Sequence, residues 1–131
     1  DYAKVLKQAH LAGYSMSDAE DQNFQTTHEL LGYMIAQSWG LAPELTNVIA
    51  YHHSHALILA SDDIYEKRLF ALLKLAEHMT DESKVLLDLD MDPEWDHHKA
   101  TILDILELDE LALHDLGDYL QQQGVPNRYH A

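Results

Sequence analysis

Residues that interrupt helices are scarce in this chain, and they fall between segments with helical spacing. The sequence has 131 residues, of which five are glycine and three are proline. Apolar residues recur three and four positions apart, and no segment shows the sustained alternation of β-branched residues that indicates a strand. The pattern therefore predicts an all-α protein, a compact bundle of about six or seven helices. The length suits one domain, so we expect residues 1–131 to form a single helical domain.

Capping residues and stop residues predict where the helices begin and end. We expect helices over residues 1–12, 17–24, 26 or 27 to 39, 43–53, 61–80, 92–106 and 109–120. Either Thr26 or Thr27 is expected to cap the third of these helices, and Asp109 the last. Ser17 and Glu20 have the spacing of a capping box, in which Ser17 caps the helix and Glu20 reaches back to it. Residues 54–60 are predicted to be a connection. Residues 81–91 fit either a helix extension or a packed loop.

The charge of the chain excludes several classes of function. Eight Lys and Arg residues against 23 Asp and Glu residues give a net charge of −15. Binding to nucleic acid or to an anionic membrane surface needs clustered cations, which this sequence does not have. There is no cysteine for disulfides or thiolate metal sites, no secretory signal and no apolar run long enough to span a membrane. We therefore expect a cytoplasmic protein whose acidic surface would also suit a basic protein partner.

Histidine is the residue that most suggests chemistry, with ten copies in the chain. His52 and His53 are adjacent near the end of a predicted helix, so both can bind one ion only if it lies between their directions. His28, Glu29 and Glu77 are the candidates for completing such a site from other helices. Imidazole and carboxylate together suit Fe, Mn, Zn or Ni. A structural role is the alternative, because histidines at a helix end interact with its last carbonyl groups, and spacing alone favours that role.

The remaining histidines and the paired acids have simpler explanations. We expect the pair at positions 97 and 98 to lie on the surface, and His10, His78, His114 and His130 to be exposed or capping residues. The acid pairs at positions 62–63 and 109–110 lie where helix N-termini favour negative charge. A glycine-rich phosphate loop and a Gly-x-Ser-x-Gly nucleophile motif are both missing from the sequence.

One set of spaced residues goes beyond general helical pattern. It consists of Glu20, the run His-Glu-Leu-Leu-Gly at 28–32, Trp-Gly-Leu at 39–41, Pro43 and Tyr-His-His at 51–53. This set resembles the HDOD domain, a divergent all-helical member of the HD phosphohydrolase superfamily found in bacterial signalling proteins. The resemblance continues more loosely through residues 75–77 and 102–120, so it covers roughly residues 1–120. One departure is Ala42, which separates the proline from the preceding leucine.

The resemblance implies a metal site and a truncated domain. His28, His52 and His53 match metal ligands of the catalytically active HD relatives, and Glu77 stands where those relatives have a ligand aspartate. The bound ion would be a divalent metal such as Fe, Mn or Zn. The segment with the His-Asp motif is not part of this chain, so we expect the later part of an HDOD domain without its N-terminal helices.

Two functions follow from this resemblance. The first is a non-enzymatic bacterial signal-transduction module that acts through protein–protein interaction. The alternative is a metal-dependent phosphohydrolase acting on a nucleotide or a cyclic-dinucleotide phosphodiester, in which the metal activates water. We also expect self-association, because a second copy could cover the apolar surface that the missing helices would leave exposed.

Overall fold

The described part of the chain contains α-helices joined by loops and turns, and no strand. The computed structural model describes residues 1–13, 15–81, 84 and 90–129. Within them lie eight α-helices: α1 (Tyr2–Leu11), α2 (Met16–Phe24), α3 (His28–Ser38), α4 (Pro43–Tyr51), α5 (His55–Leu59), α6 (Ile64–Met79), α8 (Pro93–Leu106) and α9 (Glu110–Gln122). The all-α prediction is confirmed. None of these helices combines the length and the apolar character needed to cross a membrane.

The extra helix relative to the prediction is α5, which lies in the segment expected to be a connection. It has five residues and no side-chain cap. Five residues span little more than one turn, which is too short to show a helical period in the sequence. Most of residues 81–91 lie outside the described residues, so the choice between helix and loop there stays open.

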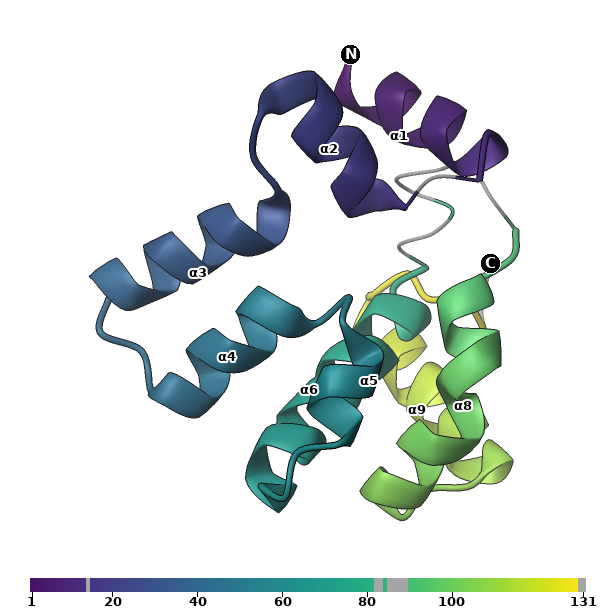
Figure 1. Cartoon of the computed structure of the whole chain (residues 1–131). Helices are drawn as coiled ribbons and strands as arrows, with labels where there is room; N and C mark the ends of the chain where they lie inside the picture. The colour runs from purple at the N-terminus through teal and green to yellow at the C-terminus, as the bar shows by residue number, and fades with distance from the viewer. Residues whose placement is uncertain (14, 82–83, 85–89, 130–131) are drawn as a thin grey trace. The chain divides into compact units, whose positions relative to one another are not determined.

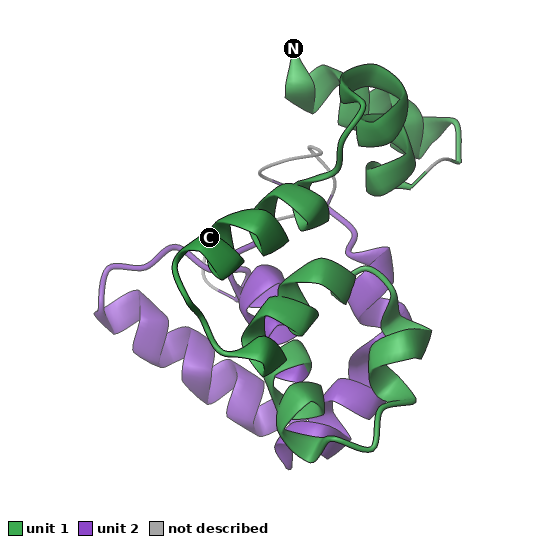
Figure 2. Cartoon of the chain, turned by 60° about the vertical axis from the view of Figure 1, so that its left-hand side comes forward, with its two compact units in different colours: residues 1–70 green, residues 71–131 purple. Residues whose placement is uncertain are grey.

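The chain divides into two compact units, residues 1–70 and residues 71–131, as Figure 2 shows. In the first unit α1 packs against α2, α2 contacts α3, and α3 and α4 form a closely packed pair (Figure 1). Gly32 on α3 makes this pairing close, since a Cβ atom there would lie only 2.9 Å from Cγ2 of Ile49 on α4. The pairing places the first residue of α3 near the last residues of α4.

Most predicted helix starts are confirmed in detail. Thr27 caps α3 by accepting the backbone N–H of Leu30 at 3.3 Å, and Pro43 begins α4. The predicted capping box at Ser17 is wrong, because α2 begins one residue earlier and Ser15 caps it through the N–H of Asp18. Ser17 and Glu20 therefore do not cap α2. Instead, Ser17 contacts Glu29 and Glu20 contacts His28, both on α3.

The second unit has its own apolar core. Six buried residues form one cluster across α6, α8 and α9: Ala71, Leu75, Met79, Trp95, Ile102 and Leu113. Asp92 caps α8 at the predicted start of that helix, and Asp109 caps α9 as predicted. These caps satisfy backbone N–H groups that would otherwise be unpaired at the helix starts.

His78 is the clearest departure from the sequence prediction in the second unit. It was expected to be exposed or capping, but it is 6% exposed. Its ring stacks on Trp95 with centroids 4.2 Å apart, and its Nδ1 lies 2.9 Å from Oδ2 of Asp92. The position follows Leu75 by three residues, so it shares the buried face of α6. His114 is exposed as predicted, and His130 lies outside the described residues.

Candidate metal site

Three imidazole rings of the first unit converge on one point. His28 is the first residue of α3, His52 follows the last residue of α4, and His53 is next to it. Nε2 of His28 lies 3.1 Å from Nε2 of His52 and 2.9 Å from Nε2 of His53. The ligand atoms of all three lie within 4.8 Å of one another, which is close enough for one metal ion. The α3–α4 pairing produces this arrangement by bringing the two helix ends together.

The outer nitrogens of two of these rings face hydrogen-bond acceptors. Nδ1 of His28 lies 2.7 Å from Oε2 of Glu20, and Nδ1 of His52 lies 2.7 Å from the carbonyl oxygen of Ile49. Neither acceptor can donate a proton, so in the neutral rings the proton is on Nδ1 and the lone pair is on Nε2. Metal-binding histidines usually have this pattern, in which a carboxylate or carbonyl fixes the ring that presents its other nitrogen to the metal.

Glu20 is a buried carboxylate whose oxygens are both engaged. The residue is 2% exposed. Oε1 accepts the hydroxyl of Tyr2, and Oε2 accepts both the backbone N–H of His28 at 2.9 Å and its ring N–H. Burial raises the pKa of the Glu20 carboxyl, but the hydrogen bonds from Tyr2 and His28 outweigh burial and bring the pKa below its ordinary value. Glu20 is therefore ionised at neutral pH.

Glu29 is a second carboxylate beside the same histidine. Its Oε1 accepts the hydroxyl of Ser17, while its Oε2 is buried without a hydrogen-bond partner and lies 3.5 Å from Nδ1 of His28. Burial raises the pKa of Glu29, but the hydrogen bond from Ser17 and the other local donors bring it below its ordinary value. An ionised oxygen without a partner is costly in a buried position unless positive charge lies nearby.

The charge and the lone pairs of this cluster fit a divalent cation. With neutral imidazoles, the ionised Glu20 and Glu29 leave two negative charges that no described lysine or arginine pairs with. The lone pairs of His28 and His52 face each other, which is unfavourable without a cation between them. Three imidazole ligands suit Zn and other first-row transition metals, and they leave one coordination position open. The donor set therefore fits the divalent metal ion that the HDOD resemblance implies.

The part of the chain that holds the three histidines matches a known protein family. Residues 1–55 match the HDOD domain. The predicted resemblance is thus confirmed for the stretch that contains all three histidines. The looser resemblance up to about residue 120 lies outside the HDOD match. Comparison with curated proteins and with solved structures finds no match.

The structure brings together three of the four predicted ligands. His28, His52 and His53 converge, and all three lie within the HDOD match. Glu77 lies on α6 in the second unit, where its Oε2 accepts Nζ of the buried Lys74 at 3.0 Å. Its role as a ligand stays a prediction. Glu29, which the sequence suggested as an alternative ligand, lies next to His28 through its Oε2.

Several residues that shape the site could not be recognised from the sequence. Tyr2 and Ser17 act through contacts with residues 18 and 12 positions away, which no local pattern reports. The carbonyl of Ile49 is a backbone group, and the sequence gives no signal for it. Glu20 belongs to the spaced HDOD-like set, but its capping-box spacing suggested a local role instead. The signal that was present is the HDOD-like set itself, which places Glu20 eight residues before His28.

A shallow cleft adjoins the cluster on the Glu20 side. Its volume is about 300 Å³, and it is lined by Tyr2, Glu20, Phe24, Thr26, Thr27, His28 and Leu31. Its walls are mainly apolar, and the residues that line it include no lysine or arginine. Glu20 and His28 are its titratable lining residues besides Tyr2, and Glu20 is only 2% exposed.

Proposed function

We propose that this chain is a non-enzymatic HDOD signal-transduction module that acts through contact with a protein partner. One divalent ion of Fe, Mn or Zn at His28, His52 and His53 would fix the helices that make this contact. The observation that carries the proposal is the charge around the histidines. Ionised Glu20 and Glu29 lie beside His28, where a phosphohydrolase would need cations.

The carboxylates make the site unsuitable for a phosphate ester. Glu20 and Glu29 offset the charge of a bound divalent ion, so little positive charge is left to attract an anionic substrate. The adjoining cleft offers no lysine or arginine among its lining residues. A phosphoryl group transferred there would have the metal ion but no Arg or Lys of the cleft lining to stabilise its developing charge. An ion in this setting is better suited to hold structure.

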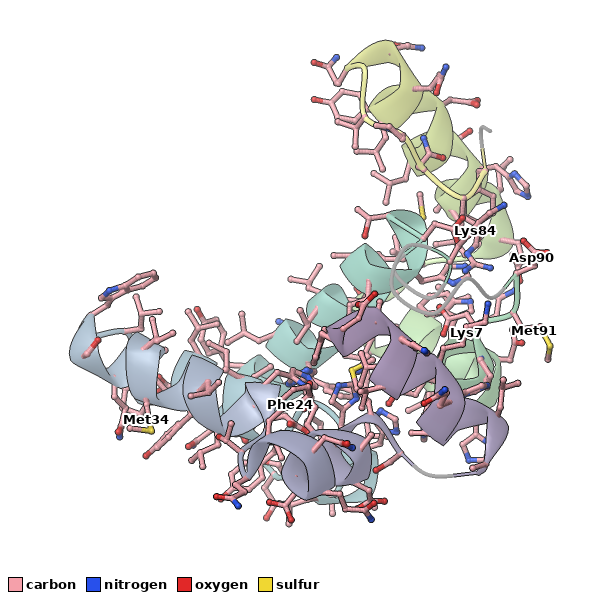
Figure 3. All side chains as sticks on the ribbon, turned by 90° about the horizontal axis from the view of Figure 1, so that it is seen from above. Lys7, Phe24, Met34, Lys84, Asp90 and Met91 are labelled. Carbon is pink, nitrogen blue, oxygen red and sulfur yellow. The ribbon has the colours of Figure 1, made fainter. Side chains whose placement is uncertain are left out.

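Such an ion would join the start of α3 to the end of α4, and α3 carries several exposed apolar side chains. On α3 and just after it, six large apolar residues are more than a third exposed: Leu30, Leu31, Met34, Ile35, Trp39 and Leu41. Met34, labelled in Figure 3, is 57% exposed. Residues 30–43 include no charged side chain, although the chain carries a net charge of −15. A neutral apolar surface of this kind is typical of a protein contact site.

A second copy of the chain is the occupant that we propose for this surface. The face has no charge to repel its own copy, and a two-fold contact would place the same apolar residues against each other. The alternative function, a phosphodiester hydrolase, is favoured by one observation. Three protein ligands leave an open coordination position, as in catalytic zinc sites, where water can bind.

A hydrolysis assay separates the two functions. The full chain would be loaded with Zn²⁺, Mn²⁺ or Fe²⁺, its metal content measured, and bis(p-nitrophenyl) phosphate added. We expect about one bound ion per chain and no turnover above that of the His52→Ala variant. Turnover that is lost in His52→Ala would overturn the non-enzymatic proposal and establish the hydrolase.

Light scattering tests the proposed contact surface. We expect the average mass of the metal-loaded chain to rise with concentration. Met34→Glu should reduce the rise, because it places a charge in the apolar face. Gln22→Glu on α2 is the matched control, since it adds the same charge at an exposed position outside the face. A monomeric mass at all concentrations, or an equal effect of the two variants, would contradict a contact through α3.

A further inference from the structure

A chain of hydrogen bonds links the first helix to the candidate metal site. The Tyr2 hydroxyl on α1 donates to Oε1 of Glu20 on α2, and Oε2 of Glu20 accepts Nδ1–H of His28 on α3. The opposite nitrogen of His28, Nε2, is the one that faces His52 and His53. Tyr2 thus lies two hydrogen bonds from a predicted metal ligand and is not itself one of the three converging residues.

We propose that docking of α1 against α2 and metal binding at the three histidines stabilise each other through Tyr2, Glu20 and His28. In this arrangement Glu20 and Tyr2 are positioning residues. The inference rests on the metal site of the proposed function. It couples that site to α1, a helix that contributes no metal ligand.

Glu20 determines how His28 is presented. Its Oε2 accepts two N–H groups of the same residue, so the ring and the backbone of His28 are both held in place. The ring proton is kept on Nδ1, which leaves the Nε2 lone pair available to a metal. A carboxylate behind a ligand histidine also makes that ligand more basic, and its loss typically weakens metal binding by about 10–100-fold.

Tyr2 in turn determines how Glu20 is held. Glu20 is 2% exposed, so water has little access to replace a lost partner. Without the Tyr2 hydroxyl, Oε1 would lose the side-chain donor that fixes the rotation of the carboxylate. The carboxylate could then turn away from His28, and the ring would lose its fixed proton position. Tyr2 is also held by an aromatic contact with Phe24, whose ring centroid is 5.8 Å from its own.

The coupling must work in both directions. If docked α1 raises metal affinity, bound metal must favour docked α1 by the same factor. The first helix is sensitive to such a contribution because it is short and its N-terminus has no side-chain cap. A helix of ten residues is marginal by itself in water and depends on packing, which here includes the buried Leu6.

Amide hydrogen exchange on the full chain, with and without Zn²⁺, tests the coupling. We expect Zn²⁺ to slow exchange at residues 2–11 of the wild-type chain, although none of them touches the ion. In Tyr2→Phe this slowing should be much smaller, and Zn²⁺ affinity measured by calorimetry should fall several-fold, towards the lower end of the range for lost supporting contacts. Tyr33→Phe is the matched control, because its hydroxyl contacts Gln37 within α3.

The outcomes separate the coupling from the site on which it rests. If Zn²⁺ binds and exchange in α1 does not change, the coupling is wrong and the metal site stands. If the wild-type chain binds no Zn²⁺, the metal site is wrong and the coupling falls with it.

In the metal-free chain, two-bond ¹H–¹⁵N spectra should show the ring proton of His28 on Nδ1 and a larger Nε2–H population in Tyr2→Phe. An unchanged ratio would remove Tyr2 from the arrangement.

Discussion

Nε2 of His28 lies 3.1 Å from Nε2 of His52, although the Nδ1 atom of each ring already faces an acceptor. Two neutral rings held in this way have no proton to share between them. A cation between the rings would make this contact favourable, either a metal ion or a proton that charges one ring. The nearby carboxylates of Glu20 and Glu29 favour a bound proton as well as a bound metal ion. A divalent ion balances both of their negative charges, whereas one proton balances a single charge.

Metal binding should depend on each of the three histidines. We expect His28→Ala and the double variant His52→Ala/His53→Ala to lose most of the Co²⁺ or Zn²⁺ bound by the wild type. Co²⁺ bound to three imidazoles should give visible absorption bands that both variants lack. His10→Ala is the control, since it removes an exposed histidine on α1. Retention of the bands in either ligand variant would contradict the assignment.

Close packing at Gly32 should matter for both stability and the site. A Cβ atom there would lie 2.9 Å from Cγ2 of Ile49, so Gly32→Ala forces α3 and α4 apart. In an exposed helix the same change would stabilise by about 1 kcal/mol. Here we expect destabilisation by about 1–3 kcal/mol, as for other overpacked positions.

The same substitution should weaken metal binding, because the carbonyl of Ile49 holds His52. Urea unfolding and Zn²⁺ calorimetry would measure the two effects. Gly13→Ala is not a suitable control because Gly13 has a positive φ of 83°. Ala50→Gly on α4 is a better one, since it alters helix propensity near the pair and adds no volume. A stabilised Gly32→Ala chain would show that α3 and α4 are not closely packed.

The Glu29 carboxylate should make stability depend on pH in the acid range. Its pKa is lowered in the folded chain, so its contribution is present above the unfolded-state pKa of about 4.3 and is lost as pH falls through the folded pKa. We expect Glu29→Gln to reduce the loss of unfolding free energy between about pH 5 and pH 3. Urea unfolding at a series of pH values would measure it, with Glu44→Gln as the control. Parallel wild-type and Glu29→Gln profiles would contradict this role.

The sequence predicts the helices well because their signals are local. Caps such as Thr27 and Asp109 and the proline at position 43 act within one turn, and the structure confirms each of them. The capping-box prediction at Ser17 is wrong because its side chain makes a tertiary contact with Glu29. A local motif cannot show that a distant partner competes for the same hydroxyl.

The candidate site was predictable only through its spacing and its resemblance. Adjacent histidines with an upstream histidine suggested convergence, and the α3–α4 pairing provides it for all three residues. The acceptors behind the rings were not predictable, since one is a backbone carbonyl and the other was interpreted as a cap. His78 was missed for a related reason. A lone histidine with no acid close in sequence gives no sign that Asp92, 14 residues later, will pair with it.

The last prediction concerns the buried contact between Asp92 and His78. Asp92 has two roles, since Oδ1 accepts the N–H of Trp95 as the cap of α8 and Oδ2 pairs with Nδ1 of His78. Asp109 has only the capping role, in which its Oδ1 accepts the N–H of Ala112 at 2.9 Å. The two substitutions to alanine therefore differ mainly by the histidine contact.

We expect Asp109→Ala to cost about 1 kcal/mol, as for a lost cap. Asp92→Ala should cost about 1–3 kcal/mol more, because His78 is buried and its Nδ1 would be left without a partner. Burial raises the pKa of Asp92, but the hydrogen bonds from His78 and the Trp95 N–H bring it below its ordinary value. The extra stability should therefore be present at neutral pH and disappear as pH falls below about 4. Fluorescence of the buried Trp95, in a Trp39→Phe background, would follow urea unfolding of this unit. Equal costs for the two variants at neutral pH would show that the His78 contact contributes no stability.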